Sequence, residues 1–292
     1  MMVMTLKHLR YFEVLARHGH FGRAAEAAAI SQPALSVQIR DLETELGAPL
    51  FERGPRGVHL TALGETFAPR ARDILRSVEE LGDLARAAQG GLAGRLRIGM
   101  IPTVAPYLLA PVIGAVAKVH PDVMPDVRET VTPTLLEELG EGRLDCAIVA
   151  LPLGEPSLTE RSLLQEDFVL IRPEVEADQP VPTPEGLATM RLLLLEEGHC
   201  FRDQALAVCE MRAQNVGLEG SSLATLVQMV GAGLGVTLLP EMALGETRSA
   251  PVCIARFPGT APSRTLGLVW RRTSPLAEPL LTLSDTIGAA LA

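Results

Sequence analysis

The sequence lacks any stretch of about 18 uncharged apolar residues, the minimum length of a membrane-spanning helix. The segment from Met1 to Arg10 also lacks the long apolar core of a secretory signal. We therefore expect the protein to stay in the cytosol, with no membrane partner.

The sequence has only four cysteines: Cys146, Cys200, Cys209 and Cys253. In a reducing compartment they do not form a disulfide framework, so any bridge would be conditional. No Cys-x-x-Cys motif occurs, and His18 and His20 have no carboxylate or thiol neighbours at ligand spacing. No glycine-rich phosphate-binding fingerprint occurs either. The sequence therefore predicts no metal site and no cofactor.

The net charge of −9 argues against indiscriminate nucleic-acid binding, but the charge is unevenly distributed. Residues 1–95 hold 12 Lys and Arg against 11 Asp and Glu, whereas residues 96–292 hold 14 against 24. The N-terminal part is therefore near neutral at +1, and the remainder carries −10. A near-neutral module on an acidic body can still bind DNA through a local basic face.

The first segment has the apolar periodicity of short helices joined by tight connections. Two stripes at helical spacing comprise Leu6, Leu9, Phe12 and Leu15, and then Phe21, Ala24, Ala25 and Ala28. A third helix is predicted to begin after Ser31, a favoured N-cap residue, and to end at Gly47. Two short helices with small residues where they cross are typical of a helix-turn-helix.

The third predicted helix has a polar face that suits a DNA groove. Its buried stripe comprises Leu35, Ile39, Leu42 and Leu46, and the opposite face comprises Gln32, Pro33, Ser36, Val37 and Arg40. The residues of that face are short or hydrogen-bonding, as expected of a surface that enters the major groove. Periodicity alone supports a small helical bundle with solvated polar faces equally well.

The turn-rich segment 51–57 carries Arg53 and Arg56. Its composition predicts a hairpin whose tip acts as a wing against phosphates or the minor groove. We therefore expect both arginines to meet DNA.

Residues 61–88 have the pattern of one long helix. Apolar residues recur at spacings of four and three, in a seam of Leu63, Phe67, Ala71, Ile74, Val78, Leu81, Ala85 and Ala88. A seam this narrow is usually buried against another helix, so we expect a dimer. Pro69 is expected to kink or delay the helix, and Gln89 to Gly91 to end it in a hinge.

From Arg95 onward, strand and helix patterns alternate. Strands are predicted at 96–100, 126–130, 144–150, 168–171, 192–195, 235–239 and 266–270. This order indicates an α/β region with a mostly parallel sheet. A length of about two hundred residues favours two small lobes joined by crossing strands, as in ligand-binding clamshells, over one such sheet.

The N-terminal motifs resemble the DNA-binding module of LysR-type transcription regulators. The matching segments are Phe21-Gly-Arg-Ala-Ala-Glu, Ser31-Gln-Pro-Ala-Leu-Ser-Val-Gln-Ile-Arg-Asp-Leu-Glu, Leu46-Gly, Leu50-Phe-Glu-Arg and Leu60-Thr. The resemblance favours the helix-turn-helix over the plain bundle. The order of the later segments, a long helix, a hinge and a two-lobed region, also agrees with the family, so the resemblance covers nearly the whole chain.

The resemblance implies an α/β architecture of three parts. These are a winged helix-turn-helix DNA-binding domain (1–60), a dimerisation linker helix with a hinge (61–92) and a two-lobed regulatory domain of the periplasmic-binding-protein kind (93–292). Lobe I is expected at about 93–168 and 267–292, and lobe II at about 169–266. The implied partners are double-stranded promoter DNA and a second copy of the chain, with dimers assembling to a homotetramer. RNA polymerase is a further candidate partner.

Five segments of the regulatory part carry a narrower resemblance. They are Gly99-Met-Ile-Pro-Thr-Val-Ala-Pro-Tyr-Leu-Leu, Leu144-Asp-Cys-Ala-Ile, Glu197-Gly-His-Cys-Phe-Arg-Asp-Gln-Ala-Leu-Ala-Val-Cys, Gly231-Ala-Gly-Leu-Gly-Val-Thr-Leu-Leu-Pro and Arg264-Thr-Leu-Gly-Leu-Val. These segments resemble the peroxide-sensing branch of the LysR-type family. The resemblance implies a regulator of oxidative-stress genes that responds to hydrogen peroxide and is not an enzyme.

The resemblance also implies roles for single residues. Cys200 matches the peroxidatic cysteine and Cys209 the resolving one. The peroxide pocket is implied at Thr103, Thr132, His199, Asp203 and Arg264. The positions that meet DNA are Gln32, Pro33, Ser36 and Arg53.

Three residues depart from the family pattern. Gly22 replaces a commoner hydroxyl or basic residue and is expected to weaken the cap of the second helix. Phe201 replaces a commoner leucine beside the reactive thiol, with an expected effect on access. Pro69 is the third departure.

The residues around Cys200 support a reactive thiol independently of the resemblance. A cysteine in a mostly apolar protein is usually inert packing, as we expect of Cys146 and Cys253 in their strand-like runs. Cys200 follows a strand pattern and Gly198, so we expect it at the start of a helix, where its thiol is reachable. A helix N-terminus and the neighbouring cations His199 and Arg202 favour the thiolate.

Peroxide oxidises such a thiolate to a sulfenic acid, which a second thiol can trap as a disulfide. The hydroxyls of Thr103 and Thr132 and the cation of Arg264 are suited to hold the peroxide and to stabilise the leaving hydroxide.

The spacing of Cys200 and Cys209 predicts a switch. Nine residues of helix rise about 13.5 Å, whereas a disulfide requires Cα atoms within about 7 Å. The bridge therefore forms only if the segment between the cysteines unwinds and repacks. That change would alter the lobe surface and the arrangement of the dimer on DNA.

Two other functions fit parts of the sequence. A LysR-type regulator that binds a small organic acid between its lobes would have the same fold, and Cys200 would be incidental. A thiol peroxidase would share the cysteine chemistry but needs no helix-turn-helix. Insensitivity to Cys200→Ser would identify the first, and steady-state peroxidase turnover the second.

Overall fold

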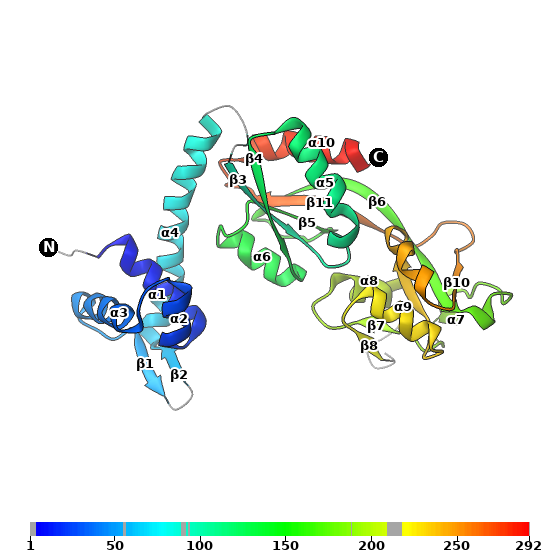
Figure 1. Cartoon of the computed structure of the whole chain (residues 1–292), viewed down its shortest axis with the longest axis horizontal. Helices are drawn as coiled ribbons and strands as arrows, with labels where there is room; N and C mark the ends of the chain where they lie inside the picture. The colour runs from blue at the N-terminus through cyan, green and yellow to red at the C-terminus, as the bar shows by residue number, and fades with distance from the viewer. Residues whose placement is uncertain are drawn as a thin grey trace. The chain divides into compact units, whose positions relative to one another are not determined.

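The computed structural model describes residues 4–54, 57–88, 92, 94–187, 189–208 and 218–291. The chain divides into two compact units, Met1–Ala85 and Arg86–Ala292 (Figure 1). The predicted hinge at 89–91 lies outside the described residues. None of the helices in the described ranges is long and apolar enough to cross a membrane.

The N-terminal unit has three short helices, a hairpin and one long helix. Its elements are α1 (Leu6–His18), α2 (Phe21–Ala27), α3 (Gln32–Leu46), β1 (Phe51–Gly54), β2 (Gly57–Leu60) and α4 (Ala62–Ala88). The predicted limits of α3 are confirmed. The Ser31 side chain accepts a hydrogen bond from the Ala34 N–H at 3.3 Å, and Gly47 ends the helix with φ at +70°.

Aromatic packing joins the hairpin and the long helix to the three short helices. Phe12 of α1 is fully buried, and its ring centroid lies 5.1 Å from that of Phe51 and 5.0 Å from that of Phe67. Ring pairs at such distances add to the free energy of apolar burial. One core therefore holds all elements of this unit together.

The expectation that Pro69 would delay the long helix is wrong. α4 begins at Ala62 and continues past Pro69, which is exposed. A proline inside a helix costs about 3 kcal/mol because it removes one hydrogen bond. Ala68 and Ala71 on the adjoining face are buried against the core, and this packing stabilises the helix across the proline.

The predicted seam of α4 divides into two parts. Phe67 and Ala71 pack against the core of their own unit, so they are not free for a second chain. Farther along, Ile74 is 43% exposed and Leu81 is 65% exposed. The dimer prediction therefore applies to the later turns of the helix, while the Ala85 and Ala88 side chains lie outside the description.

The regulatory unit is built on a seven-stranded sheet of order β10-β6-β11-β5-β3-β4, with β9 also paired to β6. Its strands are β3 (Gly94–Met100), β4 (Val123–Glu129), β5 (Cys146–Leu151), β6 (Leu158–Pro173), β9 (Thr237–Pro240), β10 (Val252–Ala255) and β11 (Ser263–Arg271). A two-stranded sheet of β7 (Leu194–Leu195) and β8 (Glu219–Gly220) is separate from it.

The prediction of a mostly parallel sheet is wrong. β3 pairs in parallel with β4 and β5, but β6 and β11 pair antiparallel with each other and with their neighbours β5, β9 and β10. The cause is the 16-residue strand β6, which runs from one half of the unit into the other beside the returning β11 (Figure 1). Antiparallel pairing follows from that return.

The regulatory unit has two separate hydrophobic cores. One is formed by residues between Leu92 and Ala150 together with residues between Leu266 and Ile287, and the other by residues between Phe168 and Ala255. β6 and β11 connect the two. The predicted two-lobed architecture is therefore confirmed, while its lobe boundaries stay predictions.

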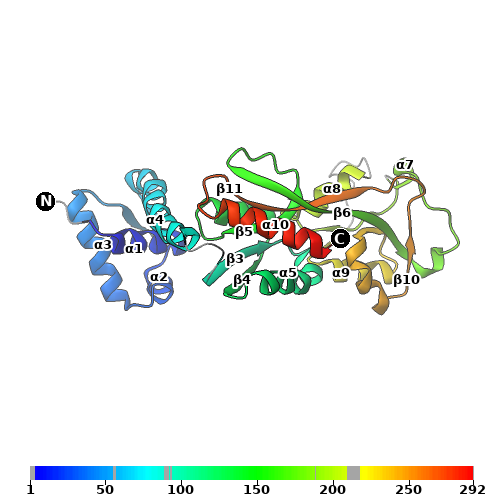
Figure 2. The same cartoon turned by 90° about the horizontal axis from the view of Figure 1, so that it is seen from above.

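Helices cover both lobes, and α5 and α10 pack against each other on the first (Figure 2). The helices are α5 (Ala105–Val119), α6 (Thr132–Gly140), η1 (Glu174–Glu176), α7 (Pro184–Leu187), α8 (Cys200–Val208), α9 (Leu223–Gly231), η3 (Glu241–Ser249) and α10 (Ala277–Leu291). α6 and α8 begin at residues singled out by the sequence, Thr132 and Cys200.

Candidate functional site

The outer face of α3 is arranged as the sequence predicts. Leu35, Ile39 and Leu42 are buried, and the opposite face presents the residues Gln32, Pro33, Ser36, Val37 and Arg40. All of the latter are exposed except Ser36, which is half-buried. Polar groups beside the apolar side chains of Pro33 and Val37 suit base edges and thymine methyl groups.

The predicted wing is the hairpin of β1 and β2, in which Arg53 lies opposite Val58. The backbone of Arg53 is described but its side chain is not, and Arg56 lies outside the described residues. A phosphate contact of either arginine therefore stays a prediction.

The helix α2 has a cap hydrogen bond, and the expectation that Gly22 weakens it stays a prediction. The cap residue is His20, whose Nδ1 accepts a hydrogen bond from the Gly22 N–H at 3.0 Å. A Cβ atom at position 22 would lie 3.1 Å from the His20 ring. Glycine therefore leaves the room in which the imidazole closes over the helix end.

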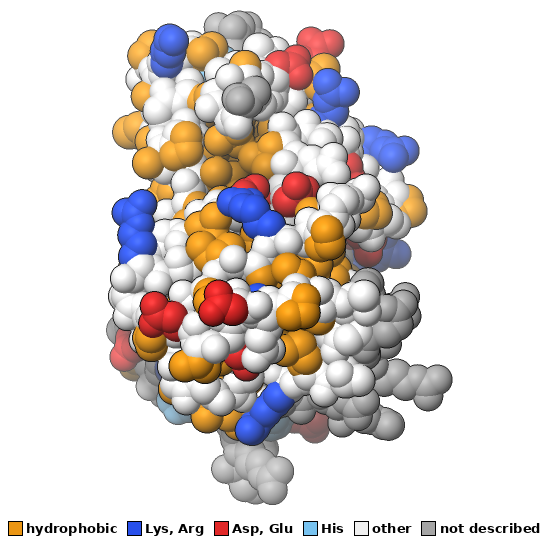
Figure 3. Space-filling model, turned by 90° about the vertical axis from the view of Figure 1, so that its right-hand side faces the viewer, with side chains coloured by type: hydrophobic (Ala, Val, Ile, Leu, Met, Phe, Trp, Pro, Cys, Tyr) orange, Lys and Arg blue, Asp and Glu red, His pale blue; other side chains and the backbone are white. Residues whose placement is uncertain are grey.

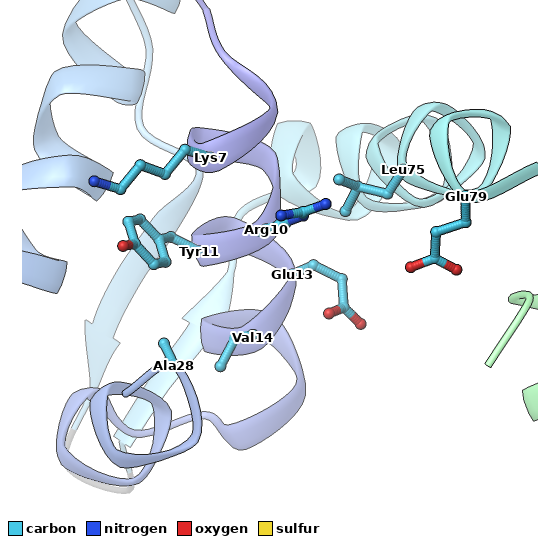
Figure 4. Close-up of a pocket in the computed structure, with 8 residues that line it drawn as sticks. All are labelled: Lys7, Arg10, Tyr11, Glu13, Val14, Ala28, Leu75 and Glu79. Carbon is cyan, nitrogen blue, oxygen red and sulfur yellow. The ribbon is translucent and has the colours of Figure 1, made fainter. Parts of the chain in front are cut away.

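A hollow of about 640 Å³ lies between α1 and α4, as Figure 4 shows. Its lining residues are Lys7, Arg10, Tyr11, Glu13, Val14, Ala28, Leu75 and Glu79. The Lys7 ammonium lies 5.6 Å from the centre of the Tyr11 ring. Because Leu75 and Glu79 belong to α4, the hollow adjoins the exposed part of the predicted seam.

Cys200 begins α8, as predicted. The strand β7 ends at Leu195, and Gly198 turns the chain with φ at +92°, a conformation that side chains disfavour. The thiol is free and half-buried, and Cys200 packs against the core of the first lobe. The thiol is thus located at a helix N-terminus and at the boundary between the two cores.

Thr132 lies close to this turn. A Cβ atom on Gly198 would be within 3.7 Å of the Val131 side chain, so the start of α6 is next to the segment before Cys200. The Thr132 hydroxyl is buried and has no hydrogen-bond partner among the described residues. An unsatisfied buried hydroxyl is costly, and a small polar ligand would satisfy it.

Arg264 and Thr103 are in direct contact. The Arg264 guanidinium donates from Nη1 to the Thr103 hydroxyl at 2.9 Å and from Nη2 to the Thr103 carbonyl at 3.1 Å. Both residues are almost fully buried. Of the five predicted pocket residues, these two are joined by hydrogen bonds.

Phe201 connects this cluster to α8. Its buried ring lies 5.5 Å from the guanidinium carbon of Arg264 and meets the Phe168 ring edge-to-face at 5.1 Å. The side chain therefore points into the core of the second lobe. The residue that departs from the family leucine is packed against the pocket arginine.

The expected cations beside the thiol are less available than the sequence suggests. Burial lowers the pKa of His199 below its usual 6.5, so this imidazole is neutral at pH 7. The Arg202 guanidinium forms an ion pair with Glu219 at 2.8 Å and donates to the Leu195 carbonyl. Its charge is therefore shared with a carboxylate, because α8 directs the side chain towards β7 and β8.

Of the two remaining predicted site residues, Asp203 is described by the structure and Cys209 is not. Asp203 lies in the first turn of α8, three residues after Cys200 and therefore on the same side of the helix, and it is exposed. Cys209 lies outside the described residues, which resume at Leu218. The described helix ends at Val208.

The other two described cysteines match the expectation of packing. Cys146 is fully buried, and this burial raises the pKa of its thiol far above the usual range. Cys253 is half-buried in β10, and its thiol lies 3.5 Å from the Pro173 carbonyl. Neither thiol lies at a helix start.

Sequence reasoning missed two acidic residues near the pocket. Glu166 is buried and pairs with Arg264 at 2.7 Å, and Glu246 accepts a hydrogen bond from Tyr107 at 3.2 Å. Burial, together with the charge of Glu246, raises the pKa of Tyr107, so its phenol stays protonated. The one available signal was an acidic pair, Glu166 and Asp167, directly before an apolar strand.

An apolar hollow of about 520 Å³ lies at the far end of the second lobe. Its walls come from the loop around Val181, the end of α8 at Val208 and the segment from Phe257 to Pro262. Figure 3 faces the end of the unit that carries α7 and β10, where apolar side chains lie together between scattered charged ones. Among the described residues that line it, the polar side chains are those of Thr183 and Thr260.

The sequence matches two protein-family models. The first is the bacterial regulatory helix-turn-helix protein model of the lysR family, over residues 6–65. The second is the LysR substrate binding domain, over residues 89–292. Together they span nearly the whole chain.

Curated relatives are similar over nearly their full length. A probable hydrogen peroxide-inducible genes activator of Streptomyces viridosporus is 43% identical, with 98% of this chain and 94% of the relative covered. The DNA-binding transcriptional dual regulator OxyR of Escherichia coli K12 is 39% identical, with 99% and 96% covered.

Two solved structures are similar in fold as well as in sequence. A full-length cysteine variant of OxyR from Pseudomonas aeruginosa has a TM-score of 0.73 and 38% identity, with 97% of this chain and 94% of that chain covered. A cysteine-to-serine mutant of Corynebacterium glutamicum OxyR, bound to H2O2, has a TM-score of 0.66 and 36% identity, with 98% and 92% covered.

Proposed function

Because the chain belongs to the LysR family of bacterial transcription regulators, we propose that it senses hydrogen peroxide at Cys200 and controls oxidative-stress genes. The relatives named as peroxide-inducible activators support this function over a response to a small organic acid. The observation that carries the proposal is the start of α8. There a half-buried thiol at a helix N-terminus is followed by Phe201, whose ring packs against the buried Arg264, and is preceded by Gly198, which adjoins Val131 before Thr132.

The pocket residues divide the work of holding a peroxide. The unpartnered hydroxyl of Thr132 binds one peroxide oxygen, since it has no other acceptor or donor among the described groups. Arg264 uses three hydrogen bonds on Thr103 and Glu166, and a guanidinium carries further N–H donors for the peroxide. Neutral His199 and exposed Asp203 lie on either side of Cys200 in the chain and complete the pocket.

The chemistry proceeds in two balanced steps. The Cys200 thiolate attacks one peroxide oxygen, the O–O bond breaks, and hydroxide leaves as the sulfur becomes a sulfenic acid. The N–H groups of Arg264 stabilise the leaving hydroxide by hydrogen bonding, and the hydroxide takes up a proton to give water. The Cys209 thiol then attacks the oxidised sulfur, releases a second water and forms a disulfide.

The helix α8 makes this disulfide a conformational switch. From Cys200 to Val208 the chain is helical, which separates their Cα atoms by about 12 Å at 1.5 Å per residue. A bridge to the next residue requires about 7 Å or less. α8 must therefore unwind when the bridge forms, and the second-lobe core that holds Phe201 and Ala205 must repack.

DNA binding is assigned to the N-terminal unit, where the helix-turn-helix model of the lysR family matches residues 6–65. Gln32, Pro33 and Ser36 meet bases at the start of α3, and Arg53 and Arg56 meet phosphates from the wing. Two copies associate through residues 61–92, where Leu81 and Leu84 are exposed in the single chain, and dimers assemble to a tetramer. RNA polymerase is the further partner of an activator. Since the chromosome is the target, we place the protein in the cytosol.

Thiol-specific mass spectrometry tests the proposal. After a brief pulse of low peroxide, Cys200 is expected to be oxidised first and then to be found bridged to Cys209. The variant Cys209→Ser should retain Cys200 as a sulfenic acid or its over-oxidised products. Earlier modification of Cys146 or Cys253 would contradict the sensor function, and sustained peroxide turnover would indicate an enzyme.

A further inference from the structure

Glu166 lies at a junction between the peroxide pocket and the second lobe. It is 5% exposed, on β6, and the strand register places it opposite Arg264 of β11. One carboxylate oxygen accepts from Arg264 Nε at 2.7 Å, and the other accepts from the Met242 N–H at 2.9 Å. Met242 is in the first turn of η3, so one carboxylate joins the pocket arginine to that segment.

This contact determines how the guanidinium of Arg264 is oriented. The guanidinium is planar, so holding Nε against Glu166 fixes the direction of the other two nitrogens. Those nitrogens donate to the hydroxyl and the carbonyl of Thr103. The Phe201 ring, next to Cys200 in the chain, packs against the same guanidinium at 5.5 Å.

A second contact completes a closed circuit of interactions that includes both lobes. Glu246, in the second half of η3, accepts from the phenol of Tyr107 at 3.2 Å. Tyr107 is in the first turn of α5, which begins just after Thr103, and its side chain packs against the core of the second lobe. This circuit of contacts runs from Thr103 through Arg264, Glu166, η3 and Tyr107 back to the start of α5.

We propose that Glu166 is a positioning residue for the peroxide reaction. It holds the Arg264 guanidinium towards Thr103, and it keeps the pocket in register with η3 of the second lobe. Glu166 touches neither the thiol nor, in this scheme, the peroxide, so it acts through Arg264. The inference rests on the proposed function, in which Cys200 reacts with peroxide.

The variant Glu166→Gln separates positioning from folding. Glutamine keeps one acceptor oxygen, so it can accept from Arg264 Nε or from the Met242 N–H but not from both, and either orientation breaks the link between the guanidinium and η3. Peroxide oxidation of Cys200 should slow about tenfold, because a misdirected guanidinium no longer stabilises the leaving hydroxide. Alkylation of the same thiol by iodoacetamide needs no pocket arginine and should stay within about twofold of the wild-type rate.

Asp145→Asn is the matched control. Asp145 is equally buried in the first lobe, and like Glu166 it accepts from a guanidinium and from one backbone N–H, those of Arg97. It makes no contact with Thr103 or Arg264 among the interactions of the described residues. Its loss should therefore perturb the fold but leave the ratio of the two reaction rates unchanged.

The outcomes distinguish the two levels of the proposal. If wild-type Cys200 reacts no faster with peroxide than an ordinary thiol, the proposed function fails. If wild type is selective and folded Glu166→Gln is equally selective, the positioning role alone is overturned. Should Glu166→Gln fail to fold, Glu166→Asp keeps the charge but shortens the reach. It should then show a lowered peroxide rate, and a wild-type rate in that variant would also refute the role.

Discussion

The Phe201 ring packs against the Arg264 guanidinium, with 5.5 Å between the guanidinium carbon and the ring centre. Phe201 directly follows Cys200, the proposed reactive cysteine, while Arg264 comes from β11, which connects the two cores. If α8 unwinds as proposed, Arg264 loses a packing partner. The proposed reactive helix and the predicted pocket are therefore in direct contact through these two side chains.

Replacing Phe201 by leucine tests this contact. Phe201→Leu should lower the free energy of unfolding by about 1–3 kcal/mol, because it removes the edge-to-face pair with Phe168 and the ring beside Arg264. Urea unfolding of the reduced full-length protein measures the change. Phe168→Leu loses the same aromatic pair but leaves the ring that packs against Arg264, so it should affect peroxide oxidation less. Equal effects of the two variants on that rate would contradict the coupling.

The hydroxyls of Thr132 and Thr103 should respond differently to removal. Thr132→Val deletes an unsatisfied buried hydroxyl, so the protein should be as stable as wild type or more stable, yet peroxide oxidation of Cys200 should slow about tenfold. Thr103→Val deletes an acceptor of Arg264 and should destabilise the fold by about 1–3 kcal/mol as well. Thermal unfolding and stopped-flow oxidation distinguish the two. A Thr132→Val protein that is destabilised and still reacts at the wild-type rate would show that the hydroxyl serves the fold.

Local sequence features predicted the local structure of the site. The caps at Ser31 and Gly47 determine where α3 begins and ends, and Gly198 forces the turn after which Cys200 begins α8. These features depend on neighbouring residues only, so a single sequence reveals them.

Contacts between distant residues could not be predicted in the same way. Glu166 and Arg264 are 98 residues apart and meet only because β6 and β11 pair in one register. Periodicity marks a strand but not the direction of its neighbours, which is why the sheet was expected to be mostly parallel. The packing of Ala71 against the core of its own unit was also not predictable, because a heptad pattern looks the same whether the helix packs on its own chain or on a second chain.

The pH dependence of stability should reflect His199. Burial lowers the folded-state pKa of this imidazole below 6.5, so the unfolded chain binds more protons as the pH falls through that value. Near pH 7 the titration of His199 therefore does not lower the free energy of unfolding. The folded state loses stability as the pH falls from about 6.5 to the lowered pKa. Parallel urea titrations of wild type and His199→Gln should diverge in this range, with wild type losing more. Curves of the same shape would show that His199 titrates alike in both states.

The DNA contacts of α3 and of the wing should differ in kind. Gln32→Ala should cost about 1–3 kcal/mol at the specific site and flatten discrimination between sequences, because its amide suits base edges. Arg53→Ala should weaken binding to all sequences alike and lower the salt slope by about one unit. Fluorescence anisotropy with specific and scrambled duplexes at several salt concentrations measures both. If Gln32→Ala also weakened both duplexes equally, α3 would be positioning the protein rather than reading bases.

The exposed turns of α4 should hold the dimer together. Leu81 is 65% exposed in the single chain, so Leu81→Glu should leave the folding of the chain unchanged. At a dimer seam the added carboxylates would be buried without partners, which is strongly unfavourable, so the variant should be monomeric. DNA affinity should fall with it, because two linked half-site contacts become one.

Val175→Glu, at a residue that is 92% exposed on η1 of the regulatory unit, controls for the added charge. Sedimentation at micromolar concentration reports the mass of each protein. A monomeric wild type, or a Leu81→Glu variant that stays dimeric and binds DNA as before, would place the interface elsewhere.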